Sequence, residues 1–243
     1  MDIIKKLAQE LAIKEEQAKA AVQLIDEGNT IPFIARYRKE MTGALNDETL
    51  RNLHERLLYL RNLEEKKEQV INAITDQGKM TEDLKKKILS AETLVAVDDL
   101  YRPYRPKKQT RATKAKEKGL EPLANILLLQ KTTKSMEEEA AAFVNAEKGV
   151  ANAKEAIAGA KDIIAEMIAD MADYRKSIRN CTMKQGSLVV KAKDEKAESV
   201  YEMYYDFREP LSKVTGYRVL AINRGEKEKF LTVKVEAPDV QIV

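Results

Sequence analysis

The stretch that decides the fold runs from Asn46 to Gly78 and reads "NDETLRNLHERLLYLRNLEEKKEQVINAITDQG". Its apolar residues recur every three or four positions, which is the spacing of one helix face. They are Leu50, Leu53, Leu57, Leu60, Leu63, Val70, Ile71 and Ile74. Asn46 is a favourable N-cap and Gly78 a favourable C-terminal stop. The pattern predicts one helix of roughly 45 Å, at a rise of 1.5 Å per residue, against which shorter helices pack.

Residues on either side of this helix also have helical patterns. We expect helices over Ile3–Leu11 and Lys14–Glu27, and a third that starts at Asn29 or Thr30 and ends by Gly43. Beyond Gly78 two further short helices are predicted. The stretch "RPYRP" then breaks the helical pattern, because proline lacks a backbone N–H and restricts the residue before it.

Composition agrees with a helical protein. The 243 residues are 44% hydrophobic and 34% charged, with no Trp, nine Gly and six Pro, so few positions force a helix to end. We predict a mainly α fold. It has a multi-helix N-terminal region with a long central helix, an inserted helix-turn-helix subdomain and a small β element near the C-terminus.

Charge is distributed unevenly along the chain. The net charge is only +3, and the pI of 8.7 is too low for a nucleic-acid footprint that covers the whole domain. Residues 101–120, however, hold eight Lys or Arg against the single acid Glu117, a local charge of +7. The sequence therefore predicts one local basic site on a mildly acidic body.

The sequence carries the marks of a cytoplasmic protein. Cys181 is the only cysteine, and one free thiol is typical of a reducing compartment. The N-terminus lacks the apolar core of a signal peptide. No apolar run approaches the ~20 residues of a membrane span. We therefore expect a soluble, cytoplasmic protein with no membrane partner.

A helix-turn-helix unit follows the proline break. "TRATKAKEKG" predicts a helix capped by Thr110 and closed by Gly119, and "LEPLANILLLQ" predicts a second helix after a short turn. A helix that reads DNA bases presents Arg, Asn, Gln or Ser. The second helix, Glu121–Gln130, offers only Asn125 and Gln130 among apolar residues. We therefore expect it to be buried in a core rather than to read a base sequence.

The remainder of the chain mixes helices and strands. A capping box at Ser135 starts a helix, and a second long helix is expected from about Val150 to Arg179. A short strand is expected at Ser187–Lys191, followed by a helix over "DEKAESVYEMYYDF". The stretch "VTGYRVLAINRGEKEKFLTVKVE" fits either a helix, a turn at Gly225 and a strand, or a hairpin. Its last part alternates as a strand does and could pair with Ser187–Lys191.

Several of these stretches resemble one protein family. "IPFIARYRKEMTGALNDETLRNLHERLLYLRNLEEKKEQV", "VDDLYRPYRPKKQTRATKAKEKGLEPLA" and, more weakly, "YYDFREPLSKVTGYRVLAINRGEKEKFLTVKV" resemble the N-terminal region of the Tex family of bacterial transcription accessory proteins. The resemblance implies a nucleic-acid-binding protein that affects transcription and is similar to the core of a eukaryotic transcription elongation factor. Family members continue with ribonuclease-H-like, helix-hairpin-helix and OB-type RNA-binding domains. We therefore expect this chain to be a fragment without the family's main nucleic-acid-binding module.

The resemblance and the proline breaks together predict the domain organisation. Residues 1–108 and 175–243 are expected to form one discontinuous helical region. Residues 109–174 are expected to form the helix-turn-helix-like subdomain inserted into it.

The basic run is the candidate nucleic-acid-binding site. Contacts to phosphates need charge and reach rather than a fixed register, and Tyr101 and Tyr104 could stack on unpaired bases. The alternative is a solvated surface whose Tyr-Pro pairs pack on the core. The candidate residues are Arg102, Arg105, Lys107, Lys108, Arg111, Lys114, Lys116 and Lys118.

No catalytic or metal-binding pattern is visible in the sequence. His54 is the only histidine, and the pair Asp98–Asp99 is better explained by a helix cap or a salt bridge to nearby arginines. The stretch "IPFIARYRKE", which contains Arg36, Arg38 and Lys39, is interpreted as structural. There is no P-loop, GxGxxG or nucleophile–histidine arrangement. We therefore expect a non-enzyme that uses no cofactor and no metal.

Three functions remain, in order of preference. The first is the helical scaffold of a transcription accessory protein that binds RNA or DNA weakly and without sequence preference, mainly through domains outside this chain. The second is a protein-interaction module that docks on the transcription machinery or on those other domains and makes no nucleic-acid contact. The third is an enzyme. The sequence does not predict an oligomeric state.

Overall fold

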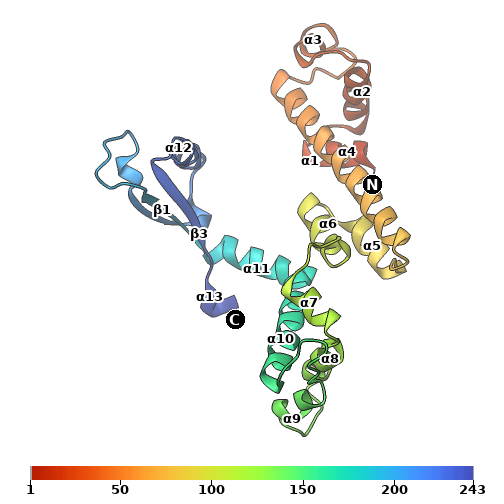
Figure 1. Ribbon diagram of the computed structural model, residues 1–243. Coiled ribbons are helices and arrows are strands. Elements are labelled where there is room, and N and C mark those ends of the chain that lie inside the picture. Colours follow the sequence, from red (N-terminus) through yellow and green to blue (C-terminus); the bar gives the residue numbers. More distant parts are fainter. Residues whose placement is uncertain (1, 243) are drawn as a thin grey trace. The chain divides into compact units, whose positions relative to one another are not determined.

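The computed structural model describes residues 2–242. By their contacts the residues divide into two units, Met1–Pro106 and Lys107–Val243, called unit 1 and unit 2 below (Figure 1). The predicted mainly α fold with a small sheet near the C-terminus is confirmed. The predicted association of residues 175–243 with residues 1–108 stays a prediction. No helix within residues 2–242 combines the length and hydropathy needed to cross a membrane.

The predicted long helix forms the centre of unit 1. Helix α4 spans Asp47–Asp76, and the side chain of Asn46 caps it by accepting a hydrogen bond from the backbone N–H of Thr49 at 2.7 Å. The apolar stripe is buried except for Ile71, which is partly exposed. One buried charge, Lys67, lies on the same helix and was not part of the predicted stripe.

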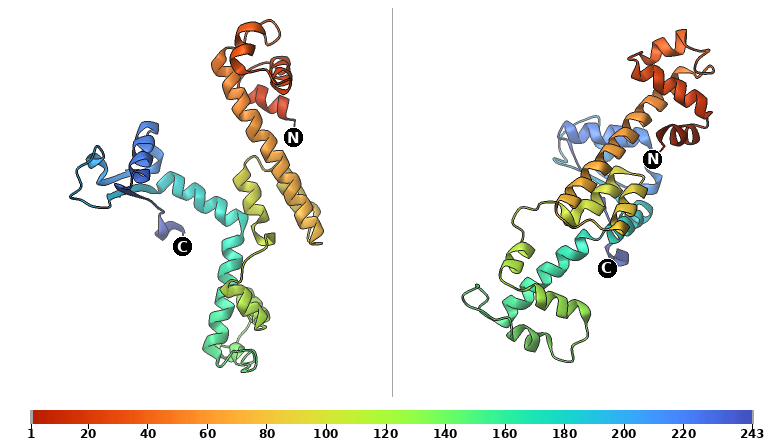
Figure 2. Two further views of the ribbon diagram at one scale, coloured as in Figure 1. Left: turned by 45° about the horizontal axis from the view of Figure 1, so that its top comes forward. Right: turned by 90° about the vertical axis from the view of Figure 1, so that its right-hand side faces the viewer.

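Shorter helices cover both halves of α4, as the sequence predicted. Helices α1 (Ile3–Glu10), α2 (Glu15–Asp26) and α3 (Ile31–Tyr37) pack around its N-terminal half, and α5 (Glu82–Ser90) and α6 (Leu94–Tyr101) pack along its C-terminal half. Figure 2 shows this arrangement within unit 1 from two further directions. A 3-10 helix, η1 (Arg102–Tyr104), then ends the unit at the predicted proline break.

Unit 2 begins with the helix-turn-helix elements. Helices α7 (Arg111–Glu117) and α8 (Glu121–Leu129) are followed by α9 (Met136–Ala141) and α10 (Ala153–Asp170). All four helices contribute to one buried core. Gly159 of α10 lies against the turn between α7 and α8, because a Cβ added there would stand 2.4 Å from Leu120 Cδ1 and 3.2 Å from Ala115 Cβ. The absence of a side chain at Gly159 therefore permits the close packing of α10 on this pair.

The prediction of one long helix from Val150 to Arg179 was wrong. The chain turns at Met171, whose backbone is extended, and α11 (Ala172–Gln185) begins as a separate helix. Asp173 lies in the first turn of α11, where a helix end favours negative charge. Arg175 Nη1 donates to the carbonyl of Ala169 at 3.3 Å, so a carbonyl left without an intrahelical partner at the end of α10 is satisfied.

The small β element is a three-stranded antiparallel sheet. Strands β1 (Ser187–Ala192), β2 (Asp206–Pro210) and β3 (Leu231–Glu236) lie in the order β2-β1-β3. The predicted pairing is confirmed, since Val190 of β1 faces Val233 of β3. Helix α12 (Gly216–Lys227) packs beside β3, and the short elements η3 (Leu211–Lys213) and α13 (Asp239–Ile242) complete the unit.

Two local predictions near the sheet were wrong. The stretch 194–207, predicted as a helix, instead holds a loop, the 3-10 helix η2 (Glu202–Tyr204) and the start of β2. Tyr201 and Tyr204 are buried there against the sheet, so tertiary packing overrides local helix propensity. The predicted turn at Gly225 lies within α12, where a Cβ added to this residue would stand 2.6 Å from Leu231 Cδ1. The actual turn is at Lys229, which has φ +68°.

Candidate nucleic-acid interface

The predicted basic run divides between the two units. Arg102 and Arg105 belong to unit 1, and Lys107 to Lys118 belong to unit 2. The Arg105 side chain forms an ion pair with Asp98, with Nη2 2.9 Å from Oδ1, as the sequence predicted for a local arginine. Arg102 is exposed and also has an interaction partner. Any phosphate contact by either arginine therefore competes with an existing interaction.

Tyr101 and Tyr104 pack on the core of unit 1. Both side chains are partly buried beside its apolar cluster. The carbonyl of Tyr104 also accepts a hydrogen bond from Gln77 Nε2 at 3.0 Å, which ties the segment to the end of α4. This packing matches the alternative interpretation of the Tyr-Pro pairs and leaves less ring surface for stacking on bases.

An acidic face of α10 neutralises the start of the basic run. Asp162, Glu166 and Asp170 are four residues apart and therefore lie on one side of the helix. Lys107 Nζ donates to Asp170 and lies 3.5 Å from Glu166 Oε1. Arg111 Nε lies 3.6 Å from Asp162 Oδ1. The sequence did not reveal these partners, because they lie about fifty to sixty residues along the chain from the basic residues that they contact.

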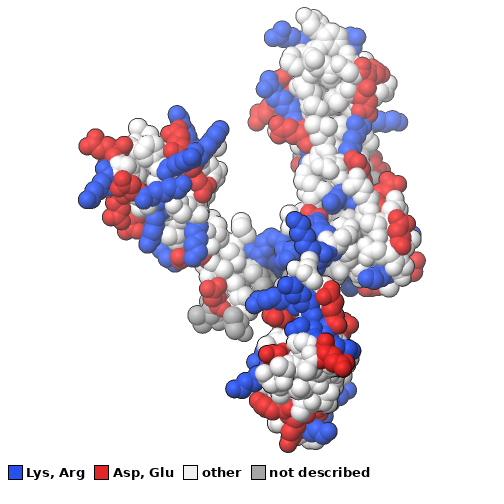
Figure 3. Space-filling model, viewed as in Figure 1, with Lys and Arg blue, Asp and Glu red and all other residues white. Residues whose placement is uncertain are grey.

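The far end of α7 is also occupied. Lys116 Nζ is 3.4 Å from Glu121 Oε1, and Lys118 Nζ donates to the carbonyl of Gly149 at 2.8 Å. Figure 3 shows Lys and Arg mixed with Asp and Glu over the visible surface of the α7–α10 part, rather than one surface of a single sign.

Lys108 and Lys114 differ from the other cations of the run. Both side chains are exposed, and within residues 2–242 neither has a hydrogen bond or an ion pair. A lysine whose ammonium group faces only water keeps its full charge available for a phosphate. The eight predicted site residues thus comprise two uncompensated lysines and six residues that already have partners.

The second helix of the pair is only partly buried. Leu123 and Ala124 lie in the core, but Leu128 and Leu129 are 41% and 62% exposed. The predicted burial holds for the first half of α8 and is wrong for the second half. The core contacts weaken after Leu127, and the helix ends at Gln130 in a left-handed conformation.

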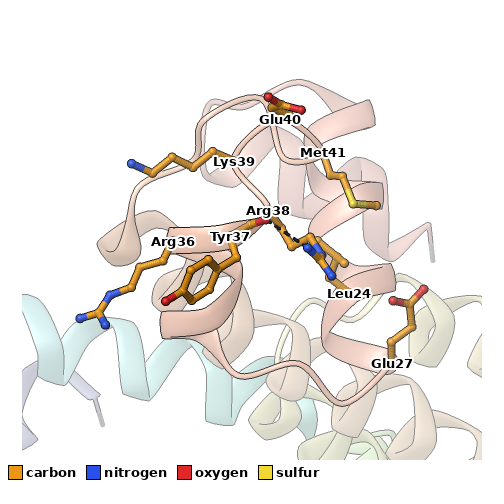
Figure 4. Close-up of a pocket in the computed structure, with 8 residues that line it drawn as sticks. All are labelled: Leu24, Glu27, Arg36, Tyr37, Arg38, Lys39, Glu40 and Met41. Carbon is orange, nitrogen blue, oxygen red and sulfur yellow. Dashed lines mark hydrogen bonds between the residues drawn. The ribbon is translucent and has the colours of Figure 1, made fainter.

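A second basic surface was interpreted as structural from the sequence and is exposed in the structure. Arg36, Tyr37, Arg38 and Lys39, at the end of α3, line an open pocket of about 570 Å³ together with Glu40, Met41, Leu24 and Glu27 (Figure 4). The interpretation was sound for Ile34, which is buried. The signal that sequence reasoning passed over is an aromatic residue placed among three cations within four positions.

The structure offers no cluster for a metal among the residues it describes. Within residues 2–242 no group of three or more His, Cys, Asp or Glu side chains lies close enough to hold a metal ion. His54 and Cys181 are each partly buried and lie on different helices, α4 and α11.

Two family models match the chain. Residues 1–75 match the Tex-like protein N-terminal domain, and residues 131–242 match the Tex central region-like family. The first match covers α1–α3 and nearly all of α4, and the second covers α9 to α13. The basic run and α8 lie between the two matched segments.

Curated relatives match nearly the whole chain. The uncharacterized protein YdcI of Bacillus subtilis is 44% identical over 96% of this chain and 33% of its own length. The transcriptional accessory protein Tex of Neisseria gonorrhoeae is 41% identical over 97% of this chain and 31% of its own length. The human S1 RNA-binding domain-containing protein 1 is 33% identical over 98% of this chain and 24% of its own length. The chain thus spans about a third or less of these relatives.

Proposed function

Because the chain belongs to the Tex family, we propose that it is the helical, non-catalytic scaffold of a nucleic-acid-binding transcription accessory protein. The observation that carries the proposal is the match to a relative named as a transcriptional accessory protein along 97% of the chain. A further relative is named for an S1 RNA-binding domain, which supports nucleic acid as the ligand class. The proposed location is the cytoplasm, and the proposed role needs no cofactor.

The chain's own contribution to binding is weak and independent of base sequence. Of the eight predicted site residues, Lys108 and Lys114 are the best candidates for phosphate contacts, because they break no existing ion pair when they bind a phosphate. Lys107, Arg111 and Lys116 must first leave carboxylates of α10 and α8. Helix α8 presents no cation to a base edge, so recognition through the phosphate backbone is the mode that fits.

A charge-reversal experiment tests this surface. The variant Lys108→Glu/Lys114→Glu is compared with wild type by fluorescence anisotropy on labelled single-stranded RNA and duplex DNA at two salt concentrations. Loss of two phosphate contacts should weaken binding to both ligands and lower the slope of log K against log salt by about 1.4–1.8. The matched control is Lys85→Glu/Lys86→Glu on α5, where both lysines are exposed and the charge change is the same. Equal binding with an unchanged salt slope would remove this surface from the proposal.

A second candidate function is a protein-interaction module without nucleic-acid contact. The observation in its favour is α11, a 14-residue helix with no buried residue. Its exposed apolar side chains include Tyr174, Ile178 and Met183, which are 49%, 42% and 59% exposed. An apolar interface of this kind depends little on salt, whereas phosphate binding weakens steeply with salt. The same titration therefore separates the two functions.

A further inference from the structure

We propose that the end of α3 and the turn after it form a second contact site, for single-stranded nucleic acid. Tyr37 stacks on an unpaired base there, and Arg36 and Lys39 bind the phosphates on either side of it. The site rests on the proposed function for its ligand class. It lies in unit 1 and shares no residue with the proposed surface at Lys108 and Lys114 of unit 2.

The turn that carries these residues is held by hydrogen bonds from two side chains, Thr42 and Gln17. Thr42 is fully buried. Its hydroxyl Oγ1 lies 3.2 Å from the carbonyl oxygen of Arg38 and 3.4 Å from that of Lys39, and it donates a hydrogen bond shared between them. Gln17 Nε2 of α2 donates to the carbonyls of Thr42 and Gly43, at 3.2 Å and 2.9 Å. A buried polar group that is fully bonded fixes the backbone around it. The basic residues therefore extend from a rigid turn rather than from a mobile loop.

Glycine is required at one position of this turn. Gly43 has φ +59°, and a Cβ added to it would stand 2.7 Å from Gln17 Nε2, the atom that bonds the turn. Both the left-handed backbone and the close approach favour glycine. The stretch "RYRKEMTG", residues 36–43, thus begins with exposed basic residues and ends with Thr42 and Gly43, which fix the turn.

Tyr37 is exposed and oriented. Its side chain is 65% exposed, although an aromatic ring of this size is usually buried. Its ring lies 5.2 Å from the ring of Phe33, one turn earlier on α3. The guanidinium of Arg38 stands 5.1 Å from the centroid of Phe33 and donates to the carbonyl of Tyr37 at 3.2 Å. These contacts set the orientation of Tyr37, and its exposed ring remains accessible for stacking.

Arg36 and Lys39 supply charge beside the ring. Both are exposed, and within residues 2–242 neither has a hydrogen bond or an ion pair from its side chain. In Figure 4 the side chains of Arg36, Tyr37 and Lys39 extend to one side of α3, while Arg38, Met41 and Glu27 lie toward the other. Glu27 accepts a hydrogen bond from Gln23 Nε2 at 3.0 Å. The side that carries Tyr37 therefore presents two cations.

This combination favours a nucleic acid over an acidic protein segment. An aromatic ring flanked by cations offers a platform for a base and partners for its phosphates, which is how single strands are bound without sequence preference. The pocket of about 570 Å³ is large enough for a base. Its apolar lining is limited to Leu24, Tyr37 and Met41, of which Leu24 is almost wholly buried. An apolar anchor from a protein partner would find little surface there.

Two pairs of variants of the whole chain test the site. Tyr37→Leu should weaken binding to single-stranded RNA about tenfold by removing one stacked base, while Tyr37→Phe should bind as wild type does. Neither change should alter binding to duplex DNA, in which the bases are already stacked. Arg36→Glu/Lys39→Glu should weaken binding to single-stranded RNA and reduce the salt slope by about 1.4. Thermal unfolding of every variant should match wild type, because all these side chains are exposed.

The outcomes separate this site from the proposed surface at Lys108 and Lys114, called the α7 surface here. If Arg36→Glu/Lys39→Glu and Tyr37→Leu bind RNA as wild type does while Lys108→Glu/Lys114→Glu does not, the site is overturned and the α7 surface stands. If only the α3 variants lose affinity, the site stands and the α7 surface fails. If wild type binds neither RNA nor DNA, both are overturned.

A labelled polyglutamate peptide is the further probe. If its binding is lost in Arg36→Glu/Lys39→Glu while RNA binding is unchanged, the surface belongs to an acidic protein segment and the proposal is wrong.

Discussion

At the scale of single residues, Lys67 shows how a charge can be part of a core. Its side chain is buried on α4, and its Nζ donates to Glu64 Oε1 at 2.8 Å and to the carbonyl of Leu89 at 2.9 Å. Leu89 lies near the end of α5, where carbonyls lack intrahelical partners. Lys67 therefore links α4 to the C-terminal end of α5.

Removal of Lys67 should destabilise unit 1. Lys67→Ala leaves the carbonyl of Leu89 and the carboxylate of Glu64 without this donor, and we expect a loss of ~1–3 kcal/mol in the free energy of unfolding, measured by urea denaturation. Lys66→Ala is the control, because Lys66 forms only a looser pair, 3.6 Å from Asp98, with both side chains partly exposed. Its loss should be below ~1 kcal/mol. Equal effects of the two changes would contradict the role assigned to Lys67.

The ion pair between Glu10 and Arg56 should make stability depend on acid pH. Hydrogen bonds from Arg56 Nε and Nη2, at 2.5 Å and 2.9 Å, lower the pKa of Glu10 below its ordinary value of 4.5. A carboxylate with a lowered folded-state pKa contributes stability above its unfolded pKa and loses it as pH falls through the folded pKa. Between neutral pH and pH values below 4.5, the free energy of unfolding should therefore fall less in Glu10→Gln than in wild type. Identical pH profiles would show that the pair contributes nothing.

At the scale of elements, the sequence predicted what depends on local pattern. The caps at Asn46, Thr110 and Ser135 and the stripe of α4 follow from residue types at fixed spacing, and each is present in the structure. The break at Met171 was missed because no Gly or Pro marks the site, and residue type alone does not reveal the bond from Arg175 to the carbonyl of Ala169. Likewise, the acidic partners of Lys107 and Arg111 could not be read from the basic run alone.

The candidate site divides in the same way. The sequence identified the basic run by composition, but only the structure shows that Lys107 and Arg111 pair with α10 while Lys108 and Lys114 are uncompensated. The surface around Tyr37 was interpreted as structural, because Ile31 and Ile34 do anchor α3 in the core of unit 1. Periodicity cannot show that the next turn of chain is held outward by Thr42 and Gln17.

The packing of α10 on the helix pair depends on Gly159. Gly159→Val would place atoms against Leu120, which is 1% exposed, and should cost ~1–3 kcal/mol as an overpacked core. Ala158→Val is the control, since position 158 is exposed on the same helix and receives the same β-branched side chain. It should cost less than ~1 kcal/mol, in line with helix propensity alone. Differential scanning calorimetry measures both changes. A smaller effect at 159 than at 158 would mean that the close approach is not needed.

At the scale of the whole molecule, the chain is a helical framework with local basic sites. A net charge of +3 gives little general attraction to nucleic acid, so the proposed binding rests on particular surfaces. The proposed contact sites are short: Lys108 before α7 with Lys114 on it, and the two cations beside Tyr37, each suited to one or two phosphates. Because each proposed site offers only two uncompensated cations, we expect weak binding, with dissociation constants no tighter than the ~10⁻⁴–10⁻⁶ M of nonspecific contacts.

Photo-cross-linking tests the central claim most directly. The chain is bound to single-stranded RNA that contains a photoreactive uridine, irradiated, and digested for mass spectrometry of the linked peptides. The account predicts cross-links in two segments, residues 31–43 with Tyr37 as the main site, and residues 107–118 around Lys108 and Lys114. The links should disappear at high salt, because the contacts are to phosphates. The absence of cross-links, or cross-links confined to α11, would contradict the claim that these two basic surfaces bind nucleic acid.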